Sequence, residues 1–250
     1  MIPIDLPAIA NHLWQSTFFA AAAGLLTLLL RKNRAGVRYG VWLAASVKFL
    51  IPFSLLVAIG RLFAWRSAPA IALAHFAILV SETHQPFIVP AKITIVNTGA
   101  PLSSYLPGIL LAVWFGGFLL GLAYWGRLLL QLRAIRRQAV PLSFDLPVPV
   151  LSASGQRRME PGVFGIFRPV LILPAGITES LTPAQLDAVL AHELCHVRRR
   201  DNLTAAIHMM VEVIFWFHPL VWWLRARLVE ERERACDEEV TGDPQTFAEA

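Results

Sequence analysis

Residues 181–196 read L-T-P-A-Q-L-D-A-V-L-A-H-E-L-C-H and carry the strongest structural signal in the chain. Thr182 is a typical helix N-cap, and Pro183 suits the first helical turn, where its missing amide hydrogen costs nothing. Apolar residues then recur at helical spacing at Leu186, Val189 and Leu190. The pattern predicts a helix that carries the last five residues, H-E-L-C-H.

His192 and His196 stand four residues apart, so a helix presents both imidazoles on one face with Glu193 beside them. H-E-x-x-H is the spacing found in zinc peptidases. Zinc lowers the pKa of its bound water to about 7, and the adjacent carboxylate can take the proton as the peptide carbonyl is attacked. An accidental match is the alternative, and the helical context argues against it. We therefore expect Zn²⁺ as cofactor, His192 and His196 as metal ligands, and Glu193 as general base.

A catalytic zinc site takes three protein ligands, so a third must lie elsewhere. The best candidate is Glu233 in E-R-A-C-D, because Asp237 follows on the same helical face and can accept a hydrogen bond from a ligating histidine. Glu230 and Glu231 lack an acidic residue four positions on. The alternative, which stays open, is a solvated charged helix with i,i+4 ion pairs.

Cys195 and Cys236 are the only cysteines, so the sequence implies no disulfide framework. Either thiol could join a mixed zinc site, although a small buried apolar residue is the commoner role. His208 and His218 lie in an apolar stretch, and we expect them to be packing or interfacial residues rather than ligands.

The composition indicates a membrane protein, because 56% of the residues are hydrophobic and only 16% are charged. Leu13–Leu30, Tyr39–Ile59 and Leu106–Trp125 are each near the spanning length of about 20 residues. Lys48 interrupts the second of these. It can pair inside the helix bundle or extend its ammonium group to the membrane surface, and we expect a structural role for it. The N-terminus lacks the basic region of a secretory leader, so the first span is expected to stay in the mature chain.

Basic residues set the expected orientation. They crowd the end of the first span at Arg31, Lys32, Arg34 and Arg38, and the end of the third at Arg127, Arg133, Arg136 and Arg137. The positive-inside rule places both ends in the cytoplasm and residues 61–105 outside. The net charge of +5 suits anionic lipid head groups and gives no sign of direct nucleic acid binding. We thus expect a membrane domain over 1–126 and a cytoplasmic peptidase domain over 127–250.

Hydropathy alone would make Thr204–Leu224 a fourth span, because a helix of that length extends about 30 Å. A single crossing would leave His196 and Glu233 on opposite sides of the bilayer, so they could not share a metal. Pro219 can break the helix. We expect this segment to form a re-entrant or interfacial helical pair.

From about Pro141 the chain becomes rich in proline and β-branched residues, which predicts short strands. Gly165–Pro169 can turn a hairpin into the strand Val170–Leu173. Such a hairpin either covers the metal-site helix or holds an extended peptide substrate through main-chain hydrogen bonds.

Three stretches carry a family resemblance: V-F-G-I-F-R-P-V-L-I-L-P, then L-D-A-V-L-A-H-E-L-C-H-V-R-R-R-D-N-L, and then F-W-F-H-P-L-V-W-W-L with E-R-E-R-A-C-D. The chain resembles the beta-lactam-sensing signal-transducer metallopeptidases of bacteria (BlaR/MecR type) from about Pro161 to Val240, and more distantly the CaaX-type membrane proteases. The resemblance implies a gluzincin fold at the cytoplasmic face of the inner membrane. It further implies His192, His196 and Glu233 as zinc ligands, Glu193 as base and Asp237 as the carboxylate behind the ligands.

Members of that family answer an outside signal by cutting themselves and a cytosolic repressor. Those with a beta-lactam sensor carry a further span and a large external domain after the peptidase, and this sequence ends at Ala250. Beta-lactam sensing therefore does not follow from the resemblance.

The expected fold class is an α-helical membrane protein with an α+β zincin (gluzincin-like) domain at the cytoplasmic face. The expected function is a regulatory, multi-pass zinc endopeptidase acting on a peptide or protein substrate, such as a cytosolic transcriptional repressor. Two alternatives stay open, a housekeeping or CaaX-type membrane protease and a non-catalytic zinc-stabilised transducer. A homodimer is compatible with the expected function and with both alternatives.

Overall fold

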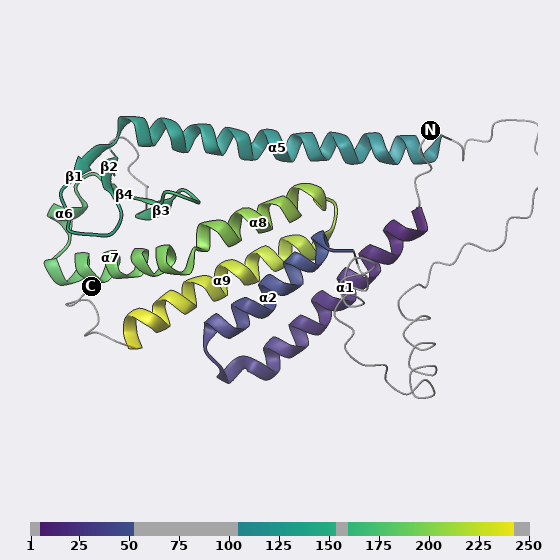
Figure 1. Ribbon diagram of the computed structural model, residues 1–250, viewed down its shortest axis with the longest axis horizontal. Coiled ribbons are helices and arrows are strands. Elements are labelled where there is room, and N and C mark those ends of the chain that lie inside the picture. Colours follow the sequence, from purple (N-terminus) through teal and green to yellow (C-terminus); the bar gives the residue numbers. More distant parts are fainter. Residues whose placement is uncertain (1–5, 53–104, 154–159, 243–250) are drawn as a thin grey trace, which may run out of the picture.

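The computed structural model of the chain describes residues 6–52, 105–153 and 160–242 (Figure 1). The expected external segment, except for Tyr105, lies outside the described residues. So does the second part of the expected span Tyr39–Ile59.

Among the described residues, two helices have the length and apolar composition needed to cross a membrane, Pro7–Lys32 and Leu106–Gln138. The first comprises α1 (Leu6–Leu29) and the short 3₁₀ helix η1 (Leu30–Lys32), and the second is α5 (Leu106–Gln138). No side chain of α5 is buried, and its surface is largely leucine and aromatic. A core helix of a soluble protein would be mostly covered, so this exposed apolar surface fits lipid.

Both helices run in the same general direction, with their basic C-terminal ends toward the side of the molecule that carries the sheet (Figure 1). The expected third span ends at Trp125, but α5 continues without a break to Gln138. Residues 127–137 are mostly leucine, arginine and other good helix formers, and they contain neither glycine nor proline. The last turns of α5 also pack on the sheet through Ile135. The helix therefore runs through the expected domain boundary at residue 126.

Helices α2 (Ala35–Leu50), α8 (Asp201–Ile214) and α9 (Pro219–Gly242) form a bundle with α1. Its core contains Trp42, Phe49, Val211, Val221 and Leu224, all nearly inaccessible to solvent. Lys48 lies inside this bundle, where its ammonium reaches Ser16 Oγ of α1 at 3.4 Å. Of the two arrangements open to Lys48, pairing within the bundle is the one observed.

The apolar segment 204–224 is not one straight helix. Within this segment α8 ends at Ile214, residues 215–218 form a turn, and α9 begins at Pro219. The two helices lie side by side and antiparallel (Figure 1). The helical pair expected from Pro219 is therefore present.

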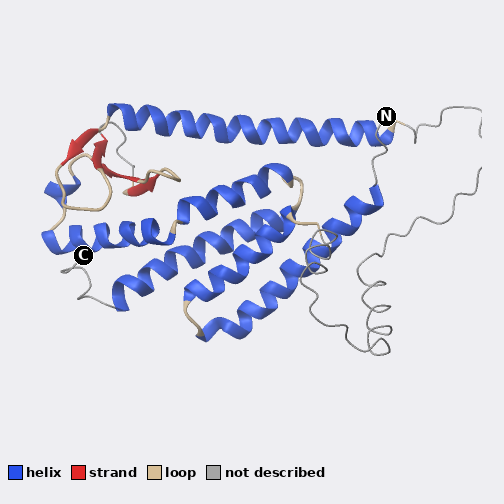
Figure 2. Cartoon of the chain, in the orientation of Figure 1, coloured by secondary structure: helices blue, strands red, loops and turns tan. Residues whose placement is uncertain are grey.

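A small sheet lies at one end of the molecule, beside the start of α7 (Figure 2). Its strands are β1 (Val140–Leu142), β2 (Val150–Ala153), β3 (Gly162–Phe164) and β4 (Val170–Pro174), in the order β1-β2-β4-β3. β2 and β4 are parallel, whereas β1 and β3 pair antiparallel to their neighbours. The expected hairpin is present: Gly165 adopts φ 101°, and a Cβ there would lie 2.5 Å from the Arg168 carbonyl oxygen.

Helices pack on both faces of this sheet. Leu171 and Leu173 of β4 pack with Leu190 of α7 (Pro183–Arg199), which follows the short helix α6 (Ile177–Ser180). On the other face, Ile172 packs with Ile135 at the end of α5. The described fold is mostly helical with a small mixed sheet, and that sheet fixes the position of α7.

Candidate metal centre

Helix α7 begins as its sequence predicts. Thr182 Oγ1 accepts a hydrogen bond from the Gln185 amide (3.3 Å), and Gln185 Oε1 accepts one from the Thr182 amide (2.9 Å), which completes a capping box. Leu186, Leu190 and Leu194 pack toward the sheet. This packing fixes the rotation of the helix and leaves its histidines facing α9. The two rings come together with their Nε2 atoms 3.2 Å apart.

Glu233 reaches the histidines because the helical hairpin has arms of equal length. α8 carries the chain away over 14 residues, about 21 Å, and the stretch of α9 from Pro219 to Glu233 brings it back by about the same distance. Glu233 Oε2 consequently lies 3.4 Å from His192 Nε2 and 3.5 Å from His196 Nε2. The structure thus brings together the three expected ligands, separated by up to 41 positions in the sequence.

The geometry of this triangle fits a zinc ion. Zinc bonds to nitrogen and oxygen measure about 2.0–2.2 Å, and a tetrahedron with such bonds has edges of about 3.3–3.6 Å. The three donor atoms are separated by 3.2, 3.4 and 3.5 Å. The side chains of His192 and Glu233 are 25% and 41% exposed, so one side of the cluster is open to water and to a substrate.

Each histidine directs its second nitrogen at a carboxylate. His192 Nδ1 lies 3.2 Å from Asp237 Oδ1, and His196 Nδ1 lies 2.7 Å from Asp201 Oδ2. Such a partner fixes the tautomer and leaves Nε2 free as a metal donor. Sequence reasoning singled out Asp237 but missed Asp201, which opens α8 five residues after His196. An acidic residue at a helix start directly after the motif was the available signal.

Arg232 orients the third candidate ligand. Its Nε and Nη2 donate to Glu233 Oε1 at 2.9 and 2.7 Å, which leaves Oε2 for the histidines. The hydrogen bond with His196 lowers the pKa of Glu233 to about 2, helped by Arg232 and opposed by burial. Burial lowers the pKa of His196, but its hydrogen bonds with Asp201 and Glu233 raise it to about 9. Asp201 and Glu233 thus stabilise a positive charge beside His196, as a cation-binding site requires.

Glu193 is nearly buried, with 9% of its surface exposed. Burial raises the pKa of its carboxyl group, while the neighbouring His196 and His192 act to lower it. A carboxyl group with a raised pKa is a better proton acceptor near neutral pH than an ordinary glutamate. Its position next to the histidines suits the expected role of general base.

The other candidates face elsewhere. Glu230 pairs with Arg227 and Arg234, and the buried Glu231 pairs with Arg38 of α2. His208 Nδ1 lies 2.8 Å from Ser46 Oγ, and His218 Nε2 lies 3.1 Å from Thr17 Oγ1; both contacts are inside the bundle. Glu230 and Glu231 thus pair with arginines and not with the histidines of α7. His208 and His218 pack inside the bundle, as expected for these two histidines.

Cys236 forms a second donor group with His196 and Asp201. Its Sγ is 3.3 Å from His196 Nδ1, the ring nitrogen that also faces Asp201. Cys236 and Asp201 are 0% and 2% exposed, so a metal held there would be closed to substrate. Cys195 is also buried and hydrogen-bonds to Glu239 at 3.2 Å. The open triangle of His192, His196 and Glu233 is the better candidate for catalysis.

The edge strand β3 is tied to the start of α8. Asn202 Nδ2 donates to the carbonyl oxygens of Val163 and Gly165, both at 3.0 Å. A peptide could pair with these carbonyls only by replacing Asn202. These contacts favour the covering role of the hairpin over the substrate-binding role at this point of the edge.

The sequence matches the family described as BlaR1 peptidase M56 over residues 11–243. Regulatory protein BlaR1 of Bacillus licheniformis is 38% identical over 77 residues, 31% of this chain and 13% of that protein. Methicillin resistance mecR1 protein of Staphylococcus aureus is 28% identical over 80 residues, 32% of this chain and 14% of that protein. Protease HtpX homolog 2 of Methanosarcina acetivorans is 39% identical over 77 residues, 29% of this chain and 26% of that protein. The alignments thus cover only about an eighth to a quarter of these relatives.

Proposed function

The chain belongs to the BlaR1 peptidase M56 family, and on that premise we propose that it is a multi-pass zinc endopeptidase of the bacterial inner membrane. Its active site faces the cytoplasm and acts on a protein substrate. The observation that carries the proposal is the triangle of His192, His196 and Glu233, whose donor atoms have the separations of a tetrahedral zinc site.

In this proposal His192, His196 and Glu233 hold the metal, while Asp237 and Asp201 keep each histidine in the tautomer that exposes Nε2. Zinc, when bound, supplies a Lewis acid that lowers the pKa of water to about 7 and polarises a carbonyl group. Glu193 accepts the proton of the attacking water and then delivers it to the leaving amine. Its burial keeps the carboxyl group able to carry that proton between the two steps.

The cytoplasmic orientation rests on charge. The basic ends of α1 and α5 lie toward the end of the molecule that carries α7 and the sheet (Figure 1). Positively charged helix ends stay in the cytoplasm. The metal triangle then opens toward cytosolic proteins, which suits cleavage of the chain itself or of a cytosolic transcriptional repressor.

The regulatory role is favoured by relatives whose names describe a regulatory protein and a methicillin resistance protein. A housekeeping membrane protease is the second candidate, because a relative named only as a protease, with no regulatory term, matches with similar identity. The two differ in their substrates: a regulatory protease cleaves one or a few proteins, whereas a housekeeping protease cleaves many.

Substitution of the base tests the activity. Glu193→Gln should retain zinc and lose about 10²- to 10⁴-fold in peptide-bond cleavage, because the side chain acts on water rather than on the metal. Metal content and cleavage are measured on the purified full chain in detergent, with the exposed Glu179→Gln as control. Comparing cytosolic fragments in cells with wild type and with Glu193→Gln then counts the substrates. Equal cleavage by the two forms would remove Glu193 from the reaction.

A further inference from the structure

A cavity of about 510 Å³ lies where α1, α2 and α9 meet. It is separate from the metal triangle, although α9 contributes to both. Its lining consists of an apolar part, here called the apolar wall, and a part that carries arginines, here called the basic wall. This composition determines what the cavity can bind.

The apolar wall depends on Gly24 of α1. A Cβ at this position would lie 3.3 Å from the ring of Trp223, so the glycine lets that indole approach the helix. Trp223 and Trp42 meet edge to face, with ring centroids 4.9 Å apart. Leu25 and Leu28 line the same wall and are 66% and 67% exposed. The wall is thus continuous with the apolar surface of α1, which meets lipid if this helix spans the membrane.

The basic wall holds Arg31, Arg38, Arg227 and Arg234. Arg38 is matched by Glu231 at 2.8 Å and by Glu238 at 4.0 Å.

Glu230 is shared between Arg227 (2.5 Å) and Arg234 (2.6 Å). Within the described residues Arg31 forms no ion pair. Four guanidinium groups therefore face three carboxylates, so the described residues around the cavity carry one unmatched positive charge.

Both walls point to an amphiphile with a single negative charge. A soluble anion would leave the apolar wall unused, and a neutral lipid would leave the excess charge unmatched. Arg31 lies at the basic end of the candidate span Pro7–Lys32, where head groups of the cytoplasmic leaflet are found. Basic pockets between spanning helices on that side are suited to anionic head groups.

We propose that this cavity binds one anionic glycerophospholipid, with its phosphate between Arg31 and Arg227 and one acyl chain along Gly24, Leu25 and Leu28. The bound lipid joins α1 to α9 on the segment of α9 that leads to Glu233. The proposal does not depend on whether the metal site cleaves peptides.

The test measures which lipid stays with the full chain. The protein is reconstituted in nanodiscs of equal parts phosphatidylglycerol and phosphatidylcholine, extracted in mild detergent, and analysed for retained lipid by native mass spectrometry. We expect retained phosphatidylglycerol in wild type. Arg31→Gln with Arg227→Gln should lower it roughly ten- to thirtyfold, since each arginine near the head group contributes to affinity.

The matched control removes the same charge from exposed residues at the same helix end that do not line the cavity, Lys32→Gln with Arg34→Gln. It should retain phosphatidylglycerol like wild type. Equal loss in both double variants, or equal retention of the two lipids by wild type, would overturn the proposal. Displacement of the lipid by excess inorganic phosphate alone would also overturn it, because the site would then be a phosphate site. Arg31→Gln by itself, at an exposed helix end, provides the same test if the double variant does not fold.

Discussion

His196 illustrates how far a metal site depends on groups behind its ligands. Its Nε2 faces the other candidate ligands, while its Nδ1 contacts Asp201, whose carboxylate is 2% exposed. Arg199 also lies 3.5 Å from Asp201, so a guanidinium group adjoins the buried carboxyl group as well. The equivalent contact of His192 is longer, and its partner Asp237 is 67% exposed. Asp201 and Asp237 should therefore contribute unequally to the affinity for zinc.

We expect Asp201→Asn to weaken zinc binding by about 10- to 100-fold, and Asp237→Asn to weaken it less, because a solvated carboxylate is easily replaced by water. Zinc affinity is measured by competition with a chelator on the purified full chain. The exposed Asp187→Asn on the same helix as His192 is the control. A larger effect of Asp237→Asn would contradict the ranking by burial and distance.

Glu233 is distinguished from its acidic neighbours by the same logic. Glu233→Ala should lower bound zinc strongly, whereas Glu230→Ala should leave the metal content unchanged, because Glu230 faces Arg227 and Arg234. Glu231→Ala should retain the metal site but destabilise the fold by about 3 kcal/mol, since it removes the buried carboxylate 2.8 Å from Arg38 and leaves only the distant Glu238. Metal analysis and thermal unfolding separate the three results. Stoichiometric zinc in all three variants would place the third ligand elsewhere.

At the scale of elements, the parts that could be predicted are those that depend on neighbours in sequence. Thr182 and Pro183 start α7, Gly165 turns the hairpin, and Pro219 starts α9, each for a local reason. The role of Asp201 could not be predicted in this way, because it depends on how α8 leaves α7. The extension of α5 to Gln138, by contrast, has a local signal in the helix-forming residues 127–137, and packing on the sheet adds to it.

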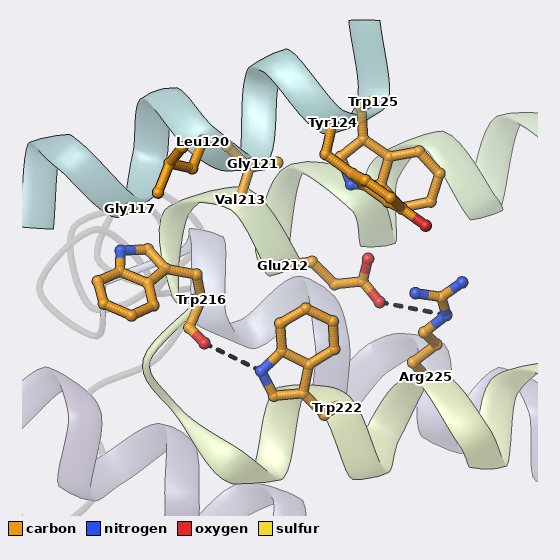
Figure 3. A pocket seen from close by; sticks show the side chains of 10 residues that line it. All are labelled: Gly117, Leu120, Gly121, Tyr124, Trp125, Glu212, Val213, Trp216, Trp222 and Arg225. Carbon is orange, nitrogen blue, oxygen red and sulfur yellow. Dashed lines mark hydrogen bonds and ion pairs between the residues drawn. The ribbon is translucent and has the colours of Figure 1, made fainter. Parts of the chain in front are cut away.

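The turn between α8 and α9 also depends on distant residues. Trp114 of α5 donates its indole hydrogen to the Ile214 carbonyl (2.8 Å), and Trp222 donates to the Trp216 carbonyl (2.9 Å). Non-helical backbone within a membrane needs such internal partners. Trp216 packs against Gly117, and both line a cavity of about 360 Å³ that is also lined by Glu212 (Figure 3).

Gly117 gives a sharp test of this contact. A Cβ at Gly117 would overlap the indole of Trp216, whereas a Cβ at Gly116 would meet nothing within 4 Å. We expect Gly117→Val to destabilise the protein by about 1–3 kcal/mol through overpacking, with α5 displaced from α8, and Gly116→Val to be nearly neutral. Thermal unfolding of both variants in the same detergent decides it. Similar unfolding temperatures would show that α5 does not pack on the turn.

At the scale of the whole molecule, the helical hairpin has a definite depth relative to the two candidate spans. Its turn meets α5 at Trp114 and Gly117, near the middle of the apolar stretch Leu106–Trp125. The same turn meets α1 through His218 and Thr17, again near the middle of that helix. If α1 and α5 span the bilayer, the turn lies within the hydrocarbon layer. We therefore favour the re-entrant form of the segment over the surface-lying one.

This depth predicts a labelling pattern for single cysteines introduced into a background without Cys195 and Cys236. Glu179 is exposed beside the sheet, and Thr241 is exposed at the end of α9. Glu179→Cys and Thr241→Cys should each react with an impermeant thiol reagent only in inverted membrane vesicles. Phe217→Cys, at the 44% exposed tip of the hairpin, should react from neither side, because lipid and not water covers it. Reaction of Phe217→Cys in inverted vesicles would indicate a hairpin lying on the membrane surface. Reaction of Thr241→Cys from outside intact cells would indicate a true crossing and would separate Glu233 from the histidines.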